Sequence, residues 1–186
     1  MRLSGNRYDE IETVIVELFK RISINKFPLD CFEICKQIGI RIVPYSRLSE
    51  KERTELSAAS KDGCCALFEI EKDKFVWVIF YNDKMSKHHI RFTIMHELGH
   101  IILDHSEHSD LAESEANYFA KYALAPPPLV HKLQIEDYIE LSERFDISYE
   151  CALYAMRKYS MWLRYGSLDF LAHEVTLISL FQPFLI

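Results

Sequence analysis

The chain has no apolar run long enough to cross a membrane, although 49% of its 186 residues are hydrophobic. It also lacks an excess of positive charge, because 28 acidic residues outnumber 22 basic ones and leave a net charge of −6. That balance argues against a broad surface for nucleic acid or for anionic lipid. The N-terminus does not show the pattern of a secretion signal. These absences favour a cytoplasmic globular protein.

The five cysteines lack Cys-x-x-Cys spacing and are odd in number. Cys31 and Cys35 are one helical turn apart, but no nearby residue completes a thiolate metal site with them. We therefore expect reduced thiols, as in a cytoplasmic protein. No internal repeat and no low-complexity linker divides the chain, and its length suits one domain with an appendage.

The most informative feature is the H-E-x-x-H motif formed by His96, Glu97 and His100. It lies in an apolar segment, residues 90–103, with helical periodicity, so we expect a helix that begins after Ser86. Histidines four residues apart share one face of a helix and can bind one Zn²⁺. Glu97 can then reach a water molecule at the metal, as a zinc-dependent peptidase requires. The alternative is a core helix with hydrogen-bonded histidines.

A catalytic zinc site normally has three protein ligands, so a third residue is needed. The metzincin pattern requires glycine and histidine three and six residues after the second histidine of the motif. Leu103 and Ser106 occupy those positions here, which excludes that class. His105 and His108 follow in a loop rich in acids and serines, where we expect both side chains to be solvated.

The next predicted helix, residues 111–125, carries the better candidates, Glu113 and Glu115. Glu113 borders a face of small residues, where two helices can approach closely, and Asn117 on that face can support a ligating side chain. Glu115 points about 160° away, among aromatic residues. We favour Glu113 as the third ligand and keep Glu115 as the alternative. The remaining interpretation is that both are surface acids.

The segments on either side of this motif are expected to form helices and short strands. The segment 75–81 is apolar on both faces and pairs in a predicted hairpin with 64–70, so we expect a central strand. The polar segment 45–62 is predicted to be a surface loop with room for a helical turn. The other expected elements are helices at 8–22, 30–38, 135–145 and 148–159, a strand at 40–43, and one more helix before Pro183.

Two sequence blocks resemble the ImmA/IrrE family of metallo-endopeptidases. They are RFTIMHELGH at residues 91–100 and ESEANYFA at 113–120, followed by a helix-ending Pro126. The resemblance covers about residues 25–130. It implies an α+β fold with a zincin-like core, a small antiparallel or mixed sheet, an active-site helix and a gluzincin-type site. One departure is Leu124-Ala125-Pro126, since relatives usually have leucine or methionine directly before the proline.

The resemblance also implies roles for individual residues. Zn²⁺ would be bound by His96, His100 and Glu113, with Glu97 as the general base. The implied role is that of an anti-repressor in bacteria or their mobile elements, which cleaves a helix-turn-helix transcriptional repressor and so induces the genes that it silences.

We expect residues 1–130 to form the peptidase core with its N-terminal helices, and residues 131–186 to form a C-terminal helical extension. Within the extension, 135–159 resembles the helix-turn-helix-like segment that follows the core in this family. Its second helix offers few cations, both near its end, so packing or protein binding is favoured over direct DNA binding. The apolar tail, 168–186, can pack on the core or join a second copy of the chain.

The sequence thus predicts a zinc-dependent endopeptidase with a specific protein substrate and no membrane partner. The rival hypothesis is a zinc-stabilised regulatory module that binds a repressor or DNA without cutting. The presence of Glu97 argues against this rival, because a structural zinc site does not need that carboxylate.

Overall fold

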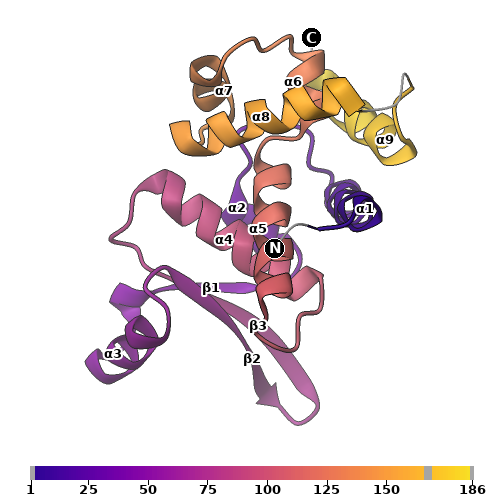
Figure 1. Ribbon diagram of the computed structural model, residues 1–186. Helices are drawn as coiled ribbons and strands as arrows, with labels where there is room; N and C mark the ends of the chain where they lie inside the picture. Colours follow the sequence, from indigo (N-terminus) through magenta and orange to yellow (C-terminus); the bar gives the residue numbers. More distant parts are fainter. Residues whose placement is uncertain (1–2, 166–168, 185–186) are drawn as a thin grey trace. The chain divides into compact units, whose positions relative to one another are not determined.

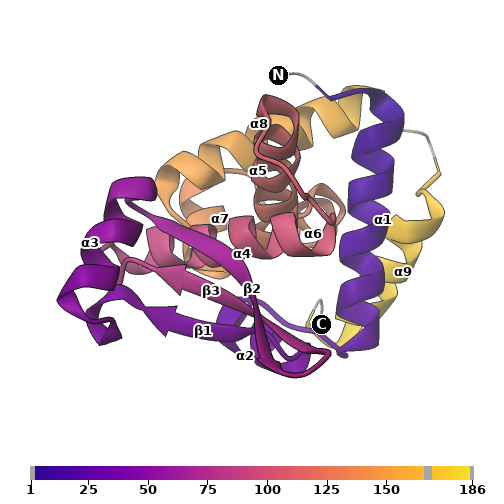
Figure 2. The ribbon, with the colours of Figure 1, turned by 90° about the horizontal axis from the view of Figure 1, so that it is seen from below.

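The computed structural model describes residues 3–165 and 169–184 (Figures 1 and 2). These residues form two compact units, which are described separately. The first unit comprises residues 30–120, and the second comprises the described residues before 30 and after 120. The predicted division of the chain into a core and an extension at residue 130 stays a prediction.

The first unit is built on a mixed sheet whose described strands have the order β1-β3-β2. β1 (Arg41–Pro44) runs parallel to β3 (Lys74–Tyr81), and β2 (Gly63–Glu71) pairs antiparallel with β3 in a hairpin. β3 is therefore central, as its apolar pattern predicted, and β2 lies at an edge. The predicted α+β class is confirmed.

Helices of the first unit cover this sheet. α4 (Lys87–Ile102) contacts β2 and β3, and it also contacts α2 (Cys31–Gln37) (Figure 1). Ser86 caps α4 as predicted, since its hydroxyl accepts a hydrogen bond from the His89 N–H at 3.3 Å. α5 (Asp110–Leu124) follows, and its residues up to Ala120 belong to this unit.

The prediction of a surface loop at residues 45–62 is wrong. A 3-10 turn, η1 (Tyr45–Arg47), is followed by the helix α3 (Glu50–Ala59). α3 starts with a capping box, in which Ser49 and Glu52 each bond the other's backbone N–H. None of the ten described residues of α3 is fully buried, so the helix lacks the apolar periodicity that would have indicated it.

The second unit is helical throughout its described elements. The predicted helices are present, and the structure adds α6, which was not predicted. The prolines that end α5 also begin α6, because proline is well tolerated in the first turn of a helix. The elements are α1 (Gly5–Arg21), α6 (Pro127–Lys132), α7 (Tyr138–Phe145), α8 (Tyr149–Tyr165), α9 (Ala172–Phe181) and the 3-10 turn η2 (Gln182–Phe184). No helix in the described parts of the chain could span a membrane.

Aromatic side chains form much of the core of the second unit. The Phe27 ring lies 4.4 Å from that of Phe145 and 4.9 Å from that of Phe181, and Phe19 of α1 meets Phe181 edge-on at 6.1 Å. α9 thus confirms the helix predicted in the apolar tail. Phe184 also approaches Phe27, while the last two residues of the tail lie outside the described residues. The proposed contact between tails of two copies stays a prediction.

A buried ion pair joins α1 to α9 within the second unit. His173 Nε2 is 3.0 Å from Glu12 Oε2, and the neighbouring Glu174 accepts a hydrogen bond from the Trp162 indole N–H. Burial alone would lower the pKa of His173, but the hydrogen bond to Glu12 and the charges of Glu12 and Glu174 together raise it. The folded state therefore holds the His173 proton more tightly than the unfolded chain does.

We expect His173→Gln to lower the melting temperature most at acidic pH. Because the folded-state pKa lies above the unfolded value of about 6.5, the stabilisation is complete below that value and is lost as pH rises through the raised pKa. Melting curves followed by circular dichroism at about pH 6 and about pH 8.5 measure the difference. A gap between wild type and variant that is equal at both pH values, or larger at the higher one, would contradict this account.

Gly63 marks a close contact between β2, β3 and α4. A Cβ atom at this position would lie 2.6 Å from Thr93 Cγ2 and 2.7 Å from the Phe80 carbonyl oxygen. The backbone of the central strand cannot swing aside, so we expect Gly63→Ala to reduce the free energy of unfolding by about 1–3 kcal/mol. Urea titration measures this, with Gly5→Ala as the control, since a Cβ at Gly5 meets nothing within 4 Å. Equal unfolding free energies for the two variants would argue against the contact.

Candidate metal centre

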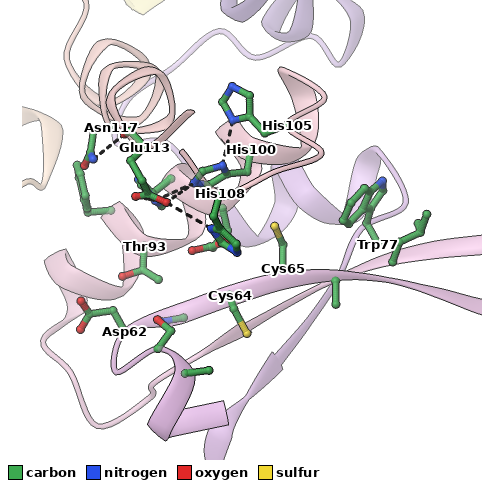
Figure 3. Close-up of a pocket in the computed structure, with 18 of the residues that line it drawn as sticks. Asp62, Cys64, Cys65, Trp77, Thr93, His100, His105, His108, Glu113 and Asn117 are labelled. Carbon is green, nitrogen blue, oxygen red and sulfur yellow. Dashed lines mark hydrogen bonds and ion pairs between the residues drawn. The ribbon is translucent and has the colours of Figure 1, made fainter. Parts of the chain in front are cut away.

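α4 and α5 bring three metal-binding side chains together. His96 and His100 are one turn apart on α4, and their Nε2 atoms are 3.2 Å from each other. Glu113 of α5 lies opposite, with Oε2 3.4 Å from His96 Nε2 and Oε1 3.3 Å from His100 Nε2 (Figure 3). These are the two histidines of the motif and the carboxylate that the sequence favoured over Glu115.

The spacing of these donor atoms fits a zinc ion. Bonds of about 2.0–2.1 Å at tetrahedral angles put ligand atoms about 3.3 Å apart. The three separations of 3.2, 3.3 and 3.4 Å agree with that value. Burial, helped by the neighbouring His96, lowers the pKa of His100 to about 4, which keeps its imidazole neutral and able to donate a lone pair.

Close packing of α4 on α5 makes this convergence possible. A Cβ atom on Gly99 would lie only 3.1 Å from Phe119 Cβ and 3.2 Å from Ala116 Cα. Asn117, which was expected to support a ligating side chain, instead donates to the backbone carbonyl oxygen of Glu113 at 2.7 Å. Asn117 therefore bonds to the backbone of α5 one turn earlier in the helix, and not to the Glu113 carboxylate.

Glu97 lies next to the donor group and is largely buried. The pKa of its carboxyl group is raised to about 6, chiefly by burial. The Cys65 thiol opposes this shift by donating a hydrogen bond to the carboxylate, and the charge of Glu113 adds to it. Burial also raises the pKa of Cys65, so this thiol keeps the proton that it donates. No sequence pattern indicates this contact, because it depends on how the hairpin packs on α4.

Glu115 does not join the donor group. Its Oε2 lies 2.9 Å from His105 Nε2, and the two side chains are only 6% and 10% exposed. The expectation that His105 would be solvated is wrong, because the chain reverses at Asp104, with φ 55°, and returns His105 to the end of α4. His108 is 98% exposed, as expected for the loop.

A cavity of about 760 Å³ opens in front of these residues. The first residues of the edge strand β2, 63–67, form one wall, and α4 with the loop at 105–108 forms another (Figure 3). Glu97, His96 and His100 all line the cavity. The donor atoms are therefore accessible to a substrate that enters beside the sheet edge.

A second group of His and Glu side chains, the Glu12–His173–Glu174 cluster of the second unit, differs from the first. His173 Nδ1 is 3.4 Å from the Thr13 hydroxyl, and Nε2 faces Glu12. Both Glu174 oxygens accept hydrogen bonds, from the Trp162 indole and from the Leu171 N–H. Hydrogen bonds within the chain therefore engage the polar atoms of this cluster, and we interpret it as an internal ion pair and not as a metal site.

Comparison with known families agrees with the geometry. The family described as IrrE N-terminal-like domain, Peptidase_M78, matches residues 35–157, about two thirds of the chain. The matched range contains α4, α5 and all three donor side chains. No curated protein matches the chain. The chain belongs to the IrrE N-terminal-like peptidase family, and a metallopeptidase type of function follows from that membership.

Proposed function

We propose that the chain is a zinc-dependent endopeptidase that acts in the cytoplasm on a helix-turn-helix transcriptional repressor. The observation that carries the proposal is the convergence of His96, His100 and Glu113 at zinc-compatible distances beside the buried Glu97. Family membership supports peptidase chemistry. The identity of the substrate, and the role as an anti-repressor of a mobile element, rest on the resemblance to ImmA/IrrE proteins.

The proposed reaction uses the residues around the cavity. His96, His100 and Glu113 would hold a zinc ion, which would supply Lewis-acid activation of the scissile carbonyl and of a water molecule. Glu97 accepts a proton from that water as its oxygen bonds to the carbonyl carbon, and donates it to the leaving amine as the C–N bond breaks. Cys65 holds the Glu97 carboxylate in place through its thiol.

Strand β2 supports the binding of an extended peptide. The central strand β3 is closed to an added strand, because β1 and β2 pair with it on either side. A peptide can instead add to β2 through backbone hydrogen bonds, and residues 63–67 of β2 line the cavity. An added strand would therefore run past Glu97, as cleavage within a chain requires.

The cations of α8 give little support to the rival role in DNA binding. Glu150 is exposed near the start of the helix, where a DNA reader usually presents its base-contacting residues. Lys158 lies 4.4 Å from the ring of Tyr8 and 5.8 Å from that of Tyr154, so its charge is engaged within the second unit. Binding of a protein through this region remains compatible with the proposal.

Zinc analysis tests the ligand set. Glu113→Gln should lose bound zinc at stoichiometric loading, because an amide is a much weaker ligand than a carboxylate, and His100→Ala should lose it as well. Glu115→Gln should hold about one zinc per chain. Elemental analysis of the purified proteins measures the content. Retention by Glu113→Gln with loss by Glu115→Gln would move the third ligand to Glu115.

Hydrolysis of the repressor tests the catalytic role. Zinc-loaded wild type should cut the repressor encoded next to this chain much faster than casein, because recognition needs extended contacts. Glu97→Gln should keep its zinc and fold, while cleavage falls by on the order of 10²-fold or more. Electrophoresis and mass spectrometry follow the products.

Three results would count against this proposal. Equal cleavage by wild type and Glu97→Gln would remove Glu97 from the reaction. Rapid casein degradation without preference for the repressor would remove the specific substrate. Tight repressor binding without cleavage, unchanged in Glu97→Gln, would favour the regulatory module.

A further inference from the structure

A chain of hydrogen bonds leads away from the donor group on its buried side. His100 Nδ1 lies 3.0 Å from His105 Nδ1, and His105 Nε2 lies 2.9 Å from Glu115 Oε2 (Figure 3 shows the first contact). All three side chains are at most 10% exposed. The chain therefore connects the ring of a candidate ligand to a buried carboxylate on α5.

The end of α4 holds His105 in this position. Asp104 adopts the left-handed conformation, and its N–H donates to the Ile101 carbonyl oxygen at 3.3 Å. The His105 N–H donates to the carbonyl oxygen of His100 itself at 3.0 Å. These two bonds are those of a Schellman motif, which reverses the chain at a helix terminus. Backbone and side chain of His105 thus both bond to His100.

The positions of the protons in this hydrogen-bonded chain follow if His100 is a metal ligand. A neutral imidazole that donates its Nε2 lone pair to a metal carries its proton on Nδ1. That N–H must find an acceptor, and His105 Nδ1 is the atom at 3.0 Å. His105 then carries its own proton on Nε2, where it donates to the Glu115 carboxylate. One arrangement of protons therefore satisfies every contact.

We propose that His105 and Glu115 are positioning residues that fix the tautomer and orientation of His100 as a metal ligand. This inference rests on the proposed zinc site, and it assigns a role to two residues that bind no metal themselves. A partner that accepts the outer N–H of a ligating histidine makes the ring a better ligand, and its loss typically weakens metal affinity by about 10–100-fold. Glu115 acts through His105, by holding that ring in turn.

The hydrogen-bonded chain His100–His105–Glu115 is called the relay below. Zinc affinity measured against a chromophoric chelator tests it. His105→Phe keeps a ring but removes the acceptor, and we expect it to weaken zinc binding by about 10–100-fold. His105→Asn, whose Oδ1 can take the place of Nδ1, should lose less than His105→Phe. Glu115→Gln keeps an acceptor for His105 but removes the charge, so it should bind more weakly than wild type and more tightly than His105→Phe.

Ser106→Ala is the matched control, because Ser106 follows His105 in the same loop and is exposed. It should bind zinc with the affinity of wild type. The visible spectrum of the cobalt-substituted proteins gives a second readout, since it responds to ligand geometry, and it should change in His105→Phe and not in Ser106→Ala. Melting of the metal-free proteins identifies any variant that does not fold. If His105→Phe does not fold, the zinc affinities of Glu115→Gln and His105→Asn test the proposal in its place.

Wild-type affinity and an unchanged cobalt spectrum in folded His105→Phe would overturn the relay, as would wild-type affinity in both Glu115→Gln and His105→Asn. Failure of the proposed peptidase is distinguishable from this result. A chain that binds zinc with the predicted ranking of variants but cuts no repressor would retain the relay and lose the enzyme. A wild-type chain that binds no zinc would overturn both.

Discussion

The approach of α4 to α5 at Gly99 sets the geometry of the site. A side chain at this position would meet the Ala116 backbone and Phe119, so the two helices lie as close as a residue without Cβ allows. At that spacing Glu113 reaches the two histidines one helical turn apart on α4. A wider spacing would separate the carboxylate from the imidazoles by more than the span of a single ion. The geometry of the candidate metal site is therefore a consequence of helix packing.

The same packing explains why Glu113 and Glu115, two residues apart on one helix, do different things. Residues two apart on a helix do not share a face. Glu113 faces the cavity side of His100, and Glu115 meets His105 at the buried end of α4. Each carboxylate thus approaches His100 from its own side, one at Nε2 and the other through His105 at Nδ1. The ring is held at both nitrogens.

Features carried by short sequence spacing could be predicted, and those that depend on tertiary contact could not. The H-E-x-x-H helix, its Ser86 cap and the central β3 all follow from patterns within a few residues. Helical angles likewise favoured Glu113 over Glu115, and its role as third ligand stays a prediction. α3 was missed because none of its residues is fully buried and they give no apolar stripe, although its capping box is visible in the sequence. The family match on residues 35–157 supports the motif without adding any of these contacts.

His105 illustrates the second kind of feature. Its loop is rich in acids and serines, which indicates solvent exposure, yet a single left-handed residue, Asp104, turns the ring into the protein. Aspartate adopts this conformation more readily than most residues, so the signal was present but not distinctive. Cys65 is a similar case, because its contact with Glu97 depends on how the β2–β3 hairpin packs against α4.

Burial then gives Glu97 and His100 opposite shifts from one cause. Removal from water disfavours the charged form of either group, so it raises the pKa of Glu97 from 4.5 to about 6 and lowers that of His100 from 6.5 to about 4. In water the imidazole would take a proton before the carboxylate, and at this site the order is reversed. Burial thus favours a neutral His100 whose lone pair is available to a metal ion. Glu97, three residues away, binds a proton more readily than a carboxylate in water does.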